Sequence, residues 1–373
     1  MKEKNGISRN RVSWIDSLKG IALLGVIMIH SGGAELPSVL GKVGKIGNSG
    51  VQMFFIISAY LSFVSYSRYI QHEDSNIKSN LCWSLKKHIR IIPLYYLALV
   101  IYTLKGGAAY WYGSIGHITM WNVLSHIFFV NGFIPHHTNS ILGVEWYLGV
   151  LVLFYYITPL LYKMINSLEK AVYWFMSSSV LCFVISKLCI LLLQPEIDEY
   201  IYSNYFSVFW LPAQFPVLML GILLYYILRS NVLEKIRYPR EFSYVLLFIS
   251  GFMIAGMIFE YNQILGIAKS TLYGIIFICI IFSQHLNSCR LIDNSIFRFL
   301  GKNSYPIYLF HFVVIDIFEK YVPEMSHGYI LNWVIKYVGV VIVTTCISIF
   351  LLRFPDRWLN GRLNHLLRKW MKN

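Results

Sequence analysis

Long apolar runs restrict the fold of this chain more than any other feature of its sequence. Residues 271–283 contain no charged side chain, and over all 373 residues 57% are hydrophobic and only 13% are charged. A soluble domain carries roughly twice that share of charge. A helix of about 20 apolar residues crosses the hydrocarbon core of a bilayer, so such runs predict transmembrane helices. The sequence therefore predicts an all-α integral membrane protein.

Ten segments are predicted to span the membrane as one domain over residues 1–373, with no appended soluble domain. The approximate centres of these spans are Leu24, Ile57, Leu97, Leu153, Leu181, Leu218, Phe248, Ile276, Leu309 and Val341. The apolar segment 121–133 is short, so we expect an interfacial or re-entrant helix there and not an eleventh span. The tail 354–373 is basic and amphipathic, which favours a position along the inner membrane surface.

The distribution of positive charge predicts how the spans are oriented. With the N-terminus inside, the inner segments hold 24 of the 32 lysines and arginines, and the outer loops hold five. Cytoplasmic loops carry such an excess of Lys and Arg. We therefore expect both termini on the cytoplasmic side and an even number of spans. The same pattern accounts for the net charge of +14, so nucleic acid is not an expected partner.

The first span carries ionisable residues on one face. Lys19 and His30 are separated by about 20° around a helix and by about 16 Å along it, and Asp16 lies on nearly the same side. Ionisable groups at membrane depth usually face a bundle interior. Taken singly, Lys19 fits a side chain that extends to the lipid headgroups, and His30 fits a helix–helix hydrogen bond. Their shared face favours a functional cavity.

A second polar face is predicted on the ninth span. Ser304, Tyr308 and His311 stand at i, i+4 and i+7, so they share one side of a helix. Hydrogen bonds between helices would explain them. A second deep histidine also suggests that two helices contribute polar groups to one cavity.

Basic residues crowd the entrance of the third span, at Lys86, Lys87 and Arg90. Clusters of this kind commonly mark the cytoplasmic end of a span. Lys and Arg at a helix entrance also suit the phosphates of a polyanionic ligand. The sequence leaves both interpretations open.

The predicted outer side carries a group of histidines within 21 residues, namely His117, His126, His136 and His137. Their spacing matches no standard zinc pattern and carboxylates are nearly absent nearby, so we expect no metal site. Glu145 and Trp146 are expected at the outer mouth of the fourth span. A tryptophan there suits an interfacial anchor, or a surface on which a sugar ring stacks.

Five motifs, in this order, resemble those of the acyltransferase 3 family of membrane O-acyltransferases. WIDSLKGIALLGVIMIH resembles the opening signature of the family, in which a basic residue stands eleven positions before a histidine, as Lys19 and His30 do. MFFIISAYL resembles FFxxSGxL, with Ala59 at the glycine position. The other three are KKHIRIIPLYYL, which resembles RxxRxxP, EWYLGVLVLFYYITPLL, which resembles Trp-x-Leu…Phe-Tyr…Pro, and FLGKNSYPIYLFH, which resembles GxxSYxxYLxH. The sequence differs from the family at Lys19 and Lys87, where arginine is usual, and at Leu151, where many members carry glutamate.

The resemblance implies transfer of an acyl group, usually acetyl, from acyl-CoA to a hydroxyl of a surface or secreted glycan at the bacterial cytoplasmic membrane. Acetyl-CoA would be a co-substrate, with no bound cofactor. His30 would act as general base or as a transient acyl carrier. The other expected catalytic residues are Asp16 and His311. The expected donor-binding residues are Lys19, Lys87, Arg90, Ser304 and Tyr308, and the expected acceptor-binding residues are Glu145 and Trp146.

Two other functions compete with this one. An exporter of polysaccharide or small acids would also have ten spans with buried charges, such as Lys187 and Asp316. Transporters often repeat a set of helices in two halves, and the sequence shows no such repeat. A membrane scaffold would leave the deep polar residues unexplained. Binding of acetyl-CoA separates the enzyme from the exporter, because an exporter has no need of CoA.

Overall fold

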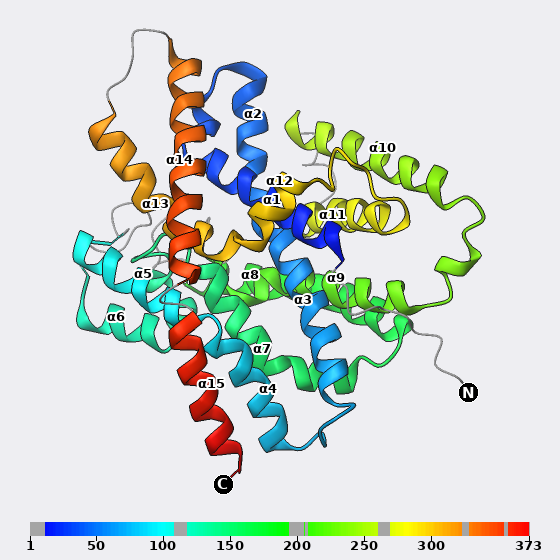
Figure 1. Cartoon of the computed structure of the whole chain (residues 1–373). Helices are drawn as coiled ribbons and strands as arrows, with labels where there is room; N and C mark the ends of the chain where they lie inside the picture. The colour runs from blue at the N-terminus through cyan, green and yellow to red at the C-terminus, as the bar shows by residue number, and fades with distance from the viewer. Residues whose placement is uncertain are drawn as a thin grey trace.

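The computed structural model describes residues 12–107, 118–193, 205, 208–259, 269–322, 328–353 and 357–372. These residues fold mainly into α-helices joined by turns and short 3-10 helices, with no β-strand among them (Figure 1). The α-helices are α1 Ser13–His30, α2 Ser38–Ile46, α3 Gly50–Tyr69, α4 Ile77–Ile89, α5 Ile92–Lys105, α6 Met120–Ile127, α7 Trp146–Met164, α8 Leu168–Leu193, α9 Leu211–Arg229, α10 Pro239–Ile258, α11 Lys269–Leu286, α12 Ser295–Lys302, α13 Ser304–Tyr321, α14 Tyr329–Leu351 and α15 Arg357–Lys372. The 3-10 helices are η1 Gly33–Glu35, η2 Gly47–Ser49, η3 Asn131–Phe133, η4 Pro135–His137 and η6 Leu233–Lys235.

Each of the ten predicted span centres lies in one of these helices. Within the described residues, eight helical stretches are long and apolar enough to cross a membrane. The two remaining candidates are α5, with 14 residues, and α13, whose 18 residues include Asp316, Glu319 and Lys320. The all-α fold and its membrane character are confirmed. The number of spans and their orientation stay predictions.

Large apolar side chains cover the outward faces of several helices. On α10, for example, Phe248 and Phe252 are 76% and 74% exposed. Soluble monomers rarely expose wide apolar patches, whereas lipid tails cover them in a bilayer. These faces are therefore expected to contact lipid.

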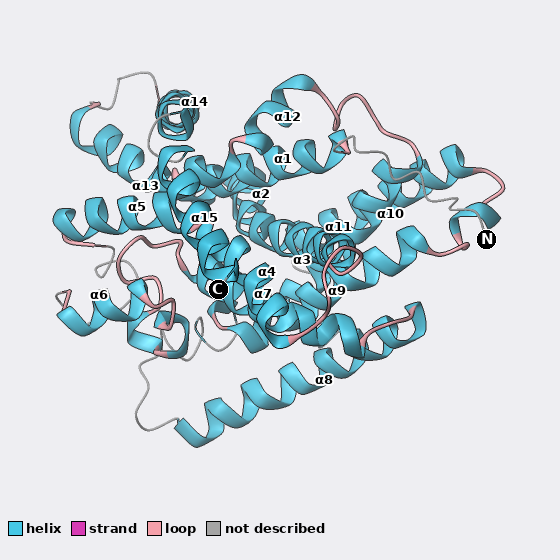
Figure 2. Cartoon of the chain, turned by 60° about the horizontal axis from the view of Figure 1, so that its bottom comes forward, coloured by secondary structure: helices cyan, strands magenta, loops and turns pink. Residues whose placement is uncertain are grey.

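Helix α1 lies within the bundle and contacts α3, α12, α13 and α14 (Figures 1 and 2). Small residues permit the closest of these contacts. A Cβ atom added at Gly301 would lie 1.7 Å from the carbonyl oxygen of Asp16, and one at Gly20 would lie 2.1 Å from that of Phe297. Small residues let the backbones of membrane helices approach closely. Glycines therefore set the crossing of α1 and α12.

Contacts between helices define two ends of the bundle. Helices α5 and α13 run in the same direction, since Tyr305 donates to the carbonyl of Ile91 at one end and Lys105 pairs with Asp316 at the other. Helix α1 shares that direction, because it meets α12 near its start and α13 near its finish. We call the end of the bundle at the start of α1 the Lys19 end, and the end of the bundle at the finish of α1 the His30 end.

The apolar segment 121–133 forms the short helix α6 followed by η3, and one face of it packs against the bundle. The hydroxyls of Tyr95 and Tyr96 in α5 donate to the carbonyls of His126 and Ile127, at 3.3 and 2.8 Å. Eight residues of helix are about 12 Å long, which is too short to cross a bilayer. The C-terminal tail forms α15, which contacts α4 (Figure 1).

Candidate active site

The imidazoles of His30 and His311 lie against each other where α1 meets α13. Nδ1 of His30 is 2.8 Å from Nε2 of His311, and Nδ1 of His311 is 2.7 Å from the carbonyl oxygen of Tyr308. A carbonyl only accepts, so Nδ1 of His311 carries a proton. Nε2 of the neutral His311 ring is then an acceptor, and His30 donates from its Nδ1. Nε2 of His30 is left unprotonated, which is the form a general base requires.

The histidine pair is held in an aromatic setting. His311 is fully buried and His30 is partly accessible. The ring of Phe312 stacks on both imidazoles, with centroid distances of 4.5 Å to His30 and 4.8 Å to His311. The packing restricts rotation of both rings, and the partial exposure of His30 leaves room for a reactant to approach it.

Tyr102 of α5 fixes the turn of α13 that carries His311. Its hydroxyl donates to the carbonyl of Leu309 at 3.0 Å and accepts from the amide of Val313 at 3.2 Å. In a regular α-helix these two backbone groups bond to each other, because they are four residues apart. The hydroxyl therefore bridges the helical ladder on either side of His311. Tyr102 was not among the predicted site residues.

Tyr308 connects the histidine pair to α7. Its hydroxyl donates to the carbonyl of Val144 at 2.8 Å, and its ring centroid lies 5.7 Å from that of Tyr147. The hydroxyl of Tyr147 is in turn 3.0 Å from Oγ of Ser58 in α3. The predicted donor-binding residue Tyr308 is thus adjacent to the pair, with its hydroxyl proton committed to the backbone.

Asp16 and Lys19 lie at the opposite end of α1 from the histidine pair. Asp16 is buried and stands 14 residues before His30, which is about 21 Å along the helix. Its carboxylate therefore cannot touch the reacting atoms at His30. Lys19 is half-buried, and Ser304 is buried at the start of α13.

Lys87 and Arg90 also lie near the Lys19 end, where α4 joins α5. Lys87 is half-buried and Arg90 is exposed. Burial, and then the neighbouring Arg90 charge, lower the pKa of Lys87 to about 8. In the part of the chain that the structure describes, no carboxylate forms an ion pair with either residue. Two adjacent cations without a counter-charge favour binding of an anion.

Glu145 is buried against His126 at the start of α7. Its carboxylate lies 2.9 Å from Nε2 of His126 and accepts from the amides of Ile141 and Val144 at 3.1 and 3.0 Å. Nδ1 of His126 faces the carbonyl of Asn122 at 2.7 Å. Burial raises the pKa of Glu145, but the hydrogen bond and the charge of His126 outweigh it and the pKa is lowered. This geometry gives Glu145 a role in positioning Val144, and its contact with an acceptor stays a prediction.

Trp146 is buried between the rings of Phe55 and Phe209, at 5.6 and 5.2 Å. It lines a cavity of about 260 Å³, to which three lysines also contribute, namely Lys42, Lys45 and Lys269. Its predicted contact with a sugar stays untested.

The histidines of the predicted outer side do not form a cluster that could hold a metal ion within the described residues. His126 is occupied by Glu145, and Nδ1 of His137 is 2.9 Å from the hydroxyl of Ser125. His117 lies outside the described residues. Elsewhere in the described ranges, no group of three or more His, Cys, Asp or Glu side chains is placed to bind a metal.

A family model described as an acyltransferase domain matches residues 12–353, which include α1 to α14 and the histidine pair. No curated protein matches the chain. The match includes all five sequence motifs and most of the chain. The chain therefore belongs to the acyltransferase 3 family.

Proposed function

We propose that this protein is a membrane O-acyltransferase that transfers an acetyl group from acetyl-CoA to a hydroxyl of a cell-envelope or secreted polysaccharide, at the bacterial cytoplasmic membrane. Membership of the family supports acyl transfer in general. One observation supports the catalytic part of the proposal: the hydrogen bonds from the Tyr308 carbonyl through His311 to His30 leave Nε2 of His30 available as a base.

The reaction proceeds by direct transfer in this proposal. Nε2 of His30 removes the proton of the acceptor hydroxyl as the oxygen attacks the thioester carbonyl. The tetrahedral intermediate collapses with cleavage of the C–S bond, and His30 returns the proton to the departing thiolate. While His30 is protonated, its Nδ1–H donates to Nε2 of His311, and that bond stabilises and orients the imidazolium. The products are an acetyl ester and free CoA.

The donor binds at the Lys19 end in this scheme. Lys87 and Arg90 hold phosphates of CoA, since they are adjacent cations without a carboxylate partner among the described residues. Lys19 lies on α1 at the same end, about 16 Å along the helix from His30. The pantetheine arm would extend along the bundle and bring the thioester to the histidine pair.

Replacement of His30 tests the proposal. We expect His30→Ala to lower the transfer of acetyl groups to envelope polysaccharide at least ~100-fold, at a normal level of protein in the membrane. The measurement is alkali-labile acetyl on the polymer. His72→Ala is the matched control, because His72 is exposed in the turn between α3 and α4. Normal acetylation in cells carrying His30→Ala would contradict the proposal. A purified wild-type chain that fails to bind acetyl-CoA would favour the exporter.

A further inference from the structure

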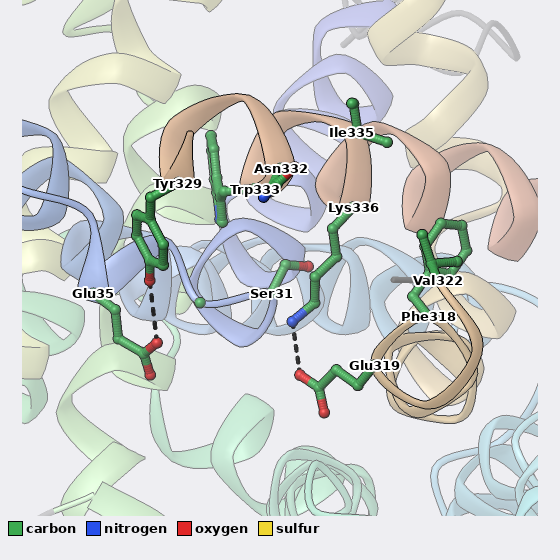
Figure 3. Close-up of a pocket in the computed structure, with 11 residues that line it drawn as sticks. Ser31, Glu35, Phe318, Glu319, Val322, Tyr329, Asn332, Trp333, Ile335 and Lys336 are labelled. Carbon is green, nitrogen blue, oxygen red and sulfur yellow. Dashed lines mark hydrogen bonds and ion pairs between the residues drawn. The ribbon is translucent and has the colours of Figure 1, made fainter. Parts of the chain in front are cut away.

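A cavity opens at the His30 end of the bundle, between the end of α1, the second half of α13 and the first two turns of α14 (Figure 3). Its volume is about 370 Å³. Ser31, the residue directly after His30, lines it. On α13 the lining begins at Phe318, two helical turns beyond His311. The cavity therefore lies beyond the histidine pair on the side away from Lys87 and Arg90, and Ser31 connects its lining to His30 along the chain.

Two polar atoms at this cavity are buried without a partner in the described part of the chain. They are Oγ of Ser31 and Nε1 of Trp333. Buried polar groups in proteins are nearly always hydrogen-bonded, so an exception requires an explanation. A hydroxyl-bearing ligand would satisfy both atoms, because the indole N–H donates and the serine hydroxyl donates or accepts.

The aromatic lining fits a sugar ring. One face of Trp333 stacks on Tyr337 at 5.3 Å, with the rings 6° from parallel. The same indole lies 4.0 Å from the position of a Cβ added at Gly32, whose φ is +89°. Any larger residue at Gly32 would be strained, because residues with a side chain rarely adopt this φ. Trp333 therefore contributes a flat aromatic ring to the wall of the cavity, held in place by Tyr337.

The charges at the cavity are mainly negative. Figure 3 shows two dashed contacts, one between Tyr329 and Glu35 at 3.4 Å and one between Lys336 and Glu319 at 2.6 Å. The lining of the cavity thus contains two carboxylates, of Glu35 and Glu319, and one ammonium group, of Lys336. Carboxylates accept hydrogen bonds from sugar hydroxyls, and their excess disfavours a polyanionic ligand.

We propose that this cavity is the acceptor subsite and that it takes an uncharged or amino sugar unit of the polysaccharide, with one hydroxyl presented to His30. The proposal rests on the proposed function and names the substrate class of that site. In this proposal the donor binds at the cationic Lys19 end of the bundle, and the acceptor binds in the cavity at the His30 end.

Two measurements on the full-length protein test this assignment. One is transfer of labelled acetyl from acetyl-CoA to polysaccharide in membranes of cells that make the polymer. The other is binding of acetyl-CoA to the purified protein. We expect Trp333→Ala to lower transfer at least tenfold and to raise the polymer concentration for half-maximal rate, with acetyl-CoA affinity within twofold of wild type. Ser31→Ala should lower transfer three- to tenfold. Trp121→Ala, on the exposed face of α6, is the control and should change neither value.

Each outcome is decisive. Transfer within twofold of wild type in Trp333→Ala would overturn the subsite. An equal loss of acetyl-CoA binding would show that Trp333 supports the whole fold, and would overturn its assignment to the acceptor. A wild-type chain that neither binds acetyl-CoA nor labels polymer would contradict the proposed function itself. Mass spectrometry of the labelled polymer tests the charge argument. An ester on a neutral or amino sugar supports it, and an ester on a uronate or sialate unit overturns it.

Discussion

At the level of single residues, the chemistry of His30 depends on which of its ring nitrogens carries the proton. The carbonyl of Tyr308 fixes the proton on His311, and His311 in turn fixes the proton on Nδ1 of His30. A buried carboxylate commonly performs this task beside a catalytic histidine. Here a neutral imidazole performs it, so no full negative charge has to be buried next to the proposed base.

This arrangement predicts different results for two replacements of His311. In His311→Gln the amide oxygen can still accept from Nδ1 of His30, so the correct tautomer persists. In His311→Ala that proton has no acceptor, and either nitrogen of His30 can carry it. We expect a loss of transfer rate of roughly 10–100-fold for His311→Ala and a clearly smaller loss for His311→Gln. Initial rates at matched protein levels measure both. Equal losses in the two variants would count against the tautomer argument.

Lys87 predicts a pH dependence of donor binding. Its pKa is lowered to about 8 by burial and by Arg90, so the free protein loses this positive charge as pH rises through that value. Affinity for the CoA phosphates should therefore fall between about pH 7 and pH 9 in the wild type. Lys87→Arg should bind with little change over the same range, because a guanidinium stays protonated. Calorimetric titration with acetyl-CoA at several pH values measures this. A parallel decline in both proteins would show that Lys87 is not the titrating group.

At the level of helices, the crossing of α1 and α12 leaves the least space for a side chain larger than that of glycine. Gly301 is the first residue of the GxxSYxxYLxH motif, and a Cβ there would meet the backbone of Asp16. Backbone atoms cannot turn aside as a side chain can, so α12 would have to move.

We expect Gly301→Ala to cost about 1–3 kcal/mol of folding stability and to lower the Tm of the purified protein. Gly251→Ala is the control, since no atom lies within 4 Å of a Cβ at that position in α10. Alanine there should leave the Tm unchanged or raise it, because alanine favours helix more than glycine does. Thermal unfolding in one detergent compares the two. A Gly301→Ala protein as stable as the Gly251→Ala protein would refute the packing argument.

Spacing in the sequence predicts faces of helices better than it predicts their partners. The shared face of Lys19 and His30, and that of Tyr308 and His311, follow from helical periodicity. That the two histidines form a hydrogen bond follows only from the packing of α1 on α13. The bridge from Tyr102 to backbone atoms of α13 leaves no trace in the pattern, because its partners are peptide groups that every residue carries.

Helical periodicity in the sequence could have predicted the polar lining of the cavity at the His30 end. Tyr329, Asn332, Trp333 and Lys336 stand at i, i+3, i+4 and i+7, so they form a polar and aromatic face at the start of an otherwise apolar span. Glu145 shows the opposite case. Its position before Trp146 predicts the outer mouth of the fourth span, but not that His126 of α6 packs against the carboxylate and buries it.

At the level of the whole molecule, Lys87 and Arg90 lie near the Lys19 end of the bundle and the cavity at Ser31 lies at the His30 end, which is the geometry expected of transfer across a membrane. The positive-inside pattern predicts that Lys87 and Arg90 face the cytoplasm, where acyl-CoA is made. Acetyl-CoA is charged and does not cross a sealed bilayer. We therefore expect inside-out vesicles to consume added acetyl-CoA, and right-side-out vesicles to do so only after permeabilisation with detergent. A protease-accessible tag after α15 reports the orientation of each preparation and serves as the control. Consumption by sealed right-side-out vesicles alone would reverse the predicted orientation, and equal consumption by both kinds of sealed vesicle would contradict a donor site on one face only.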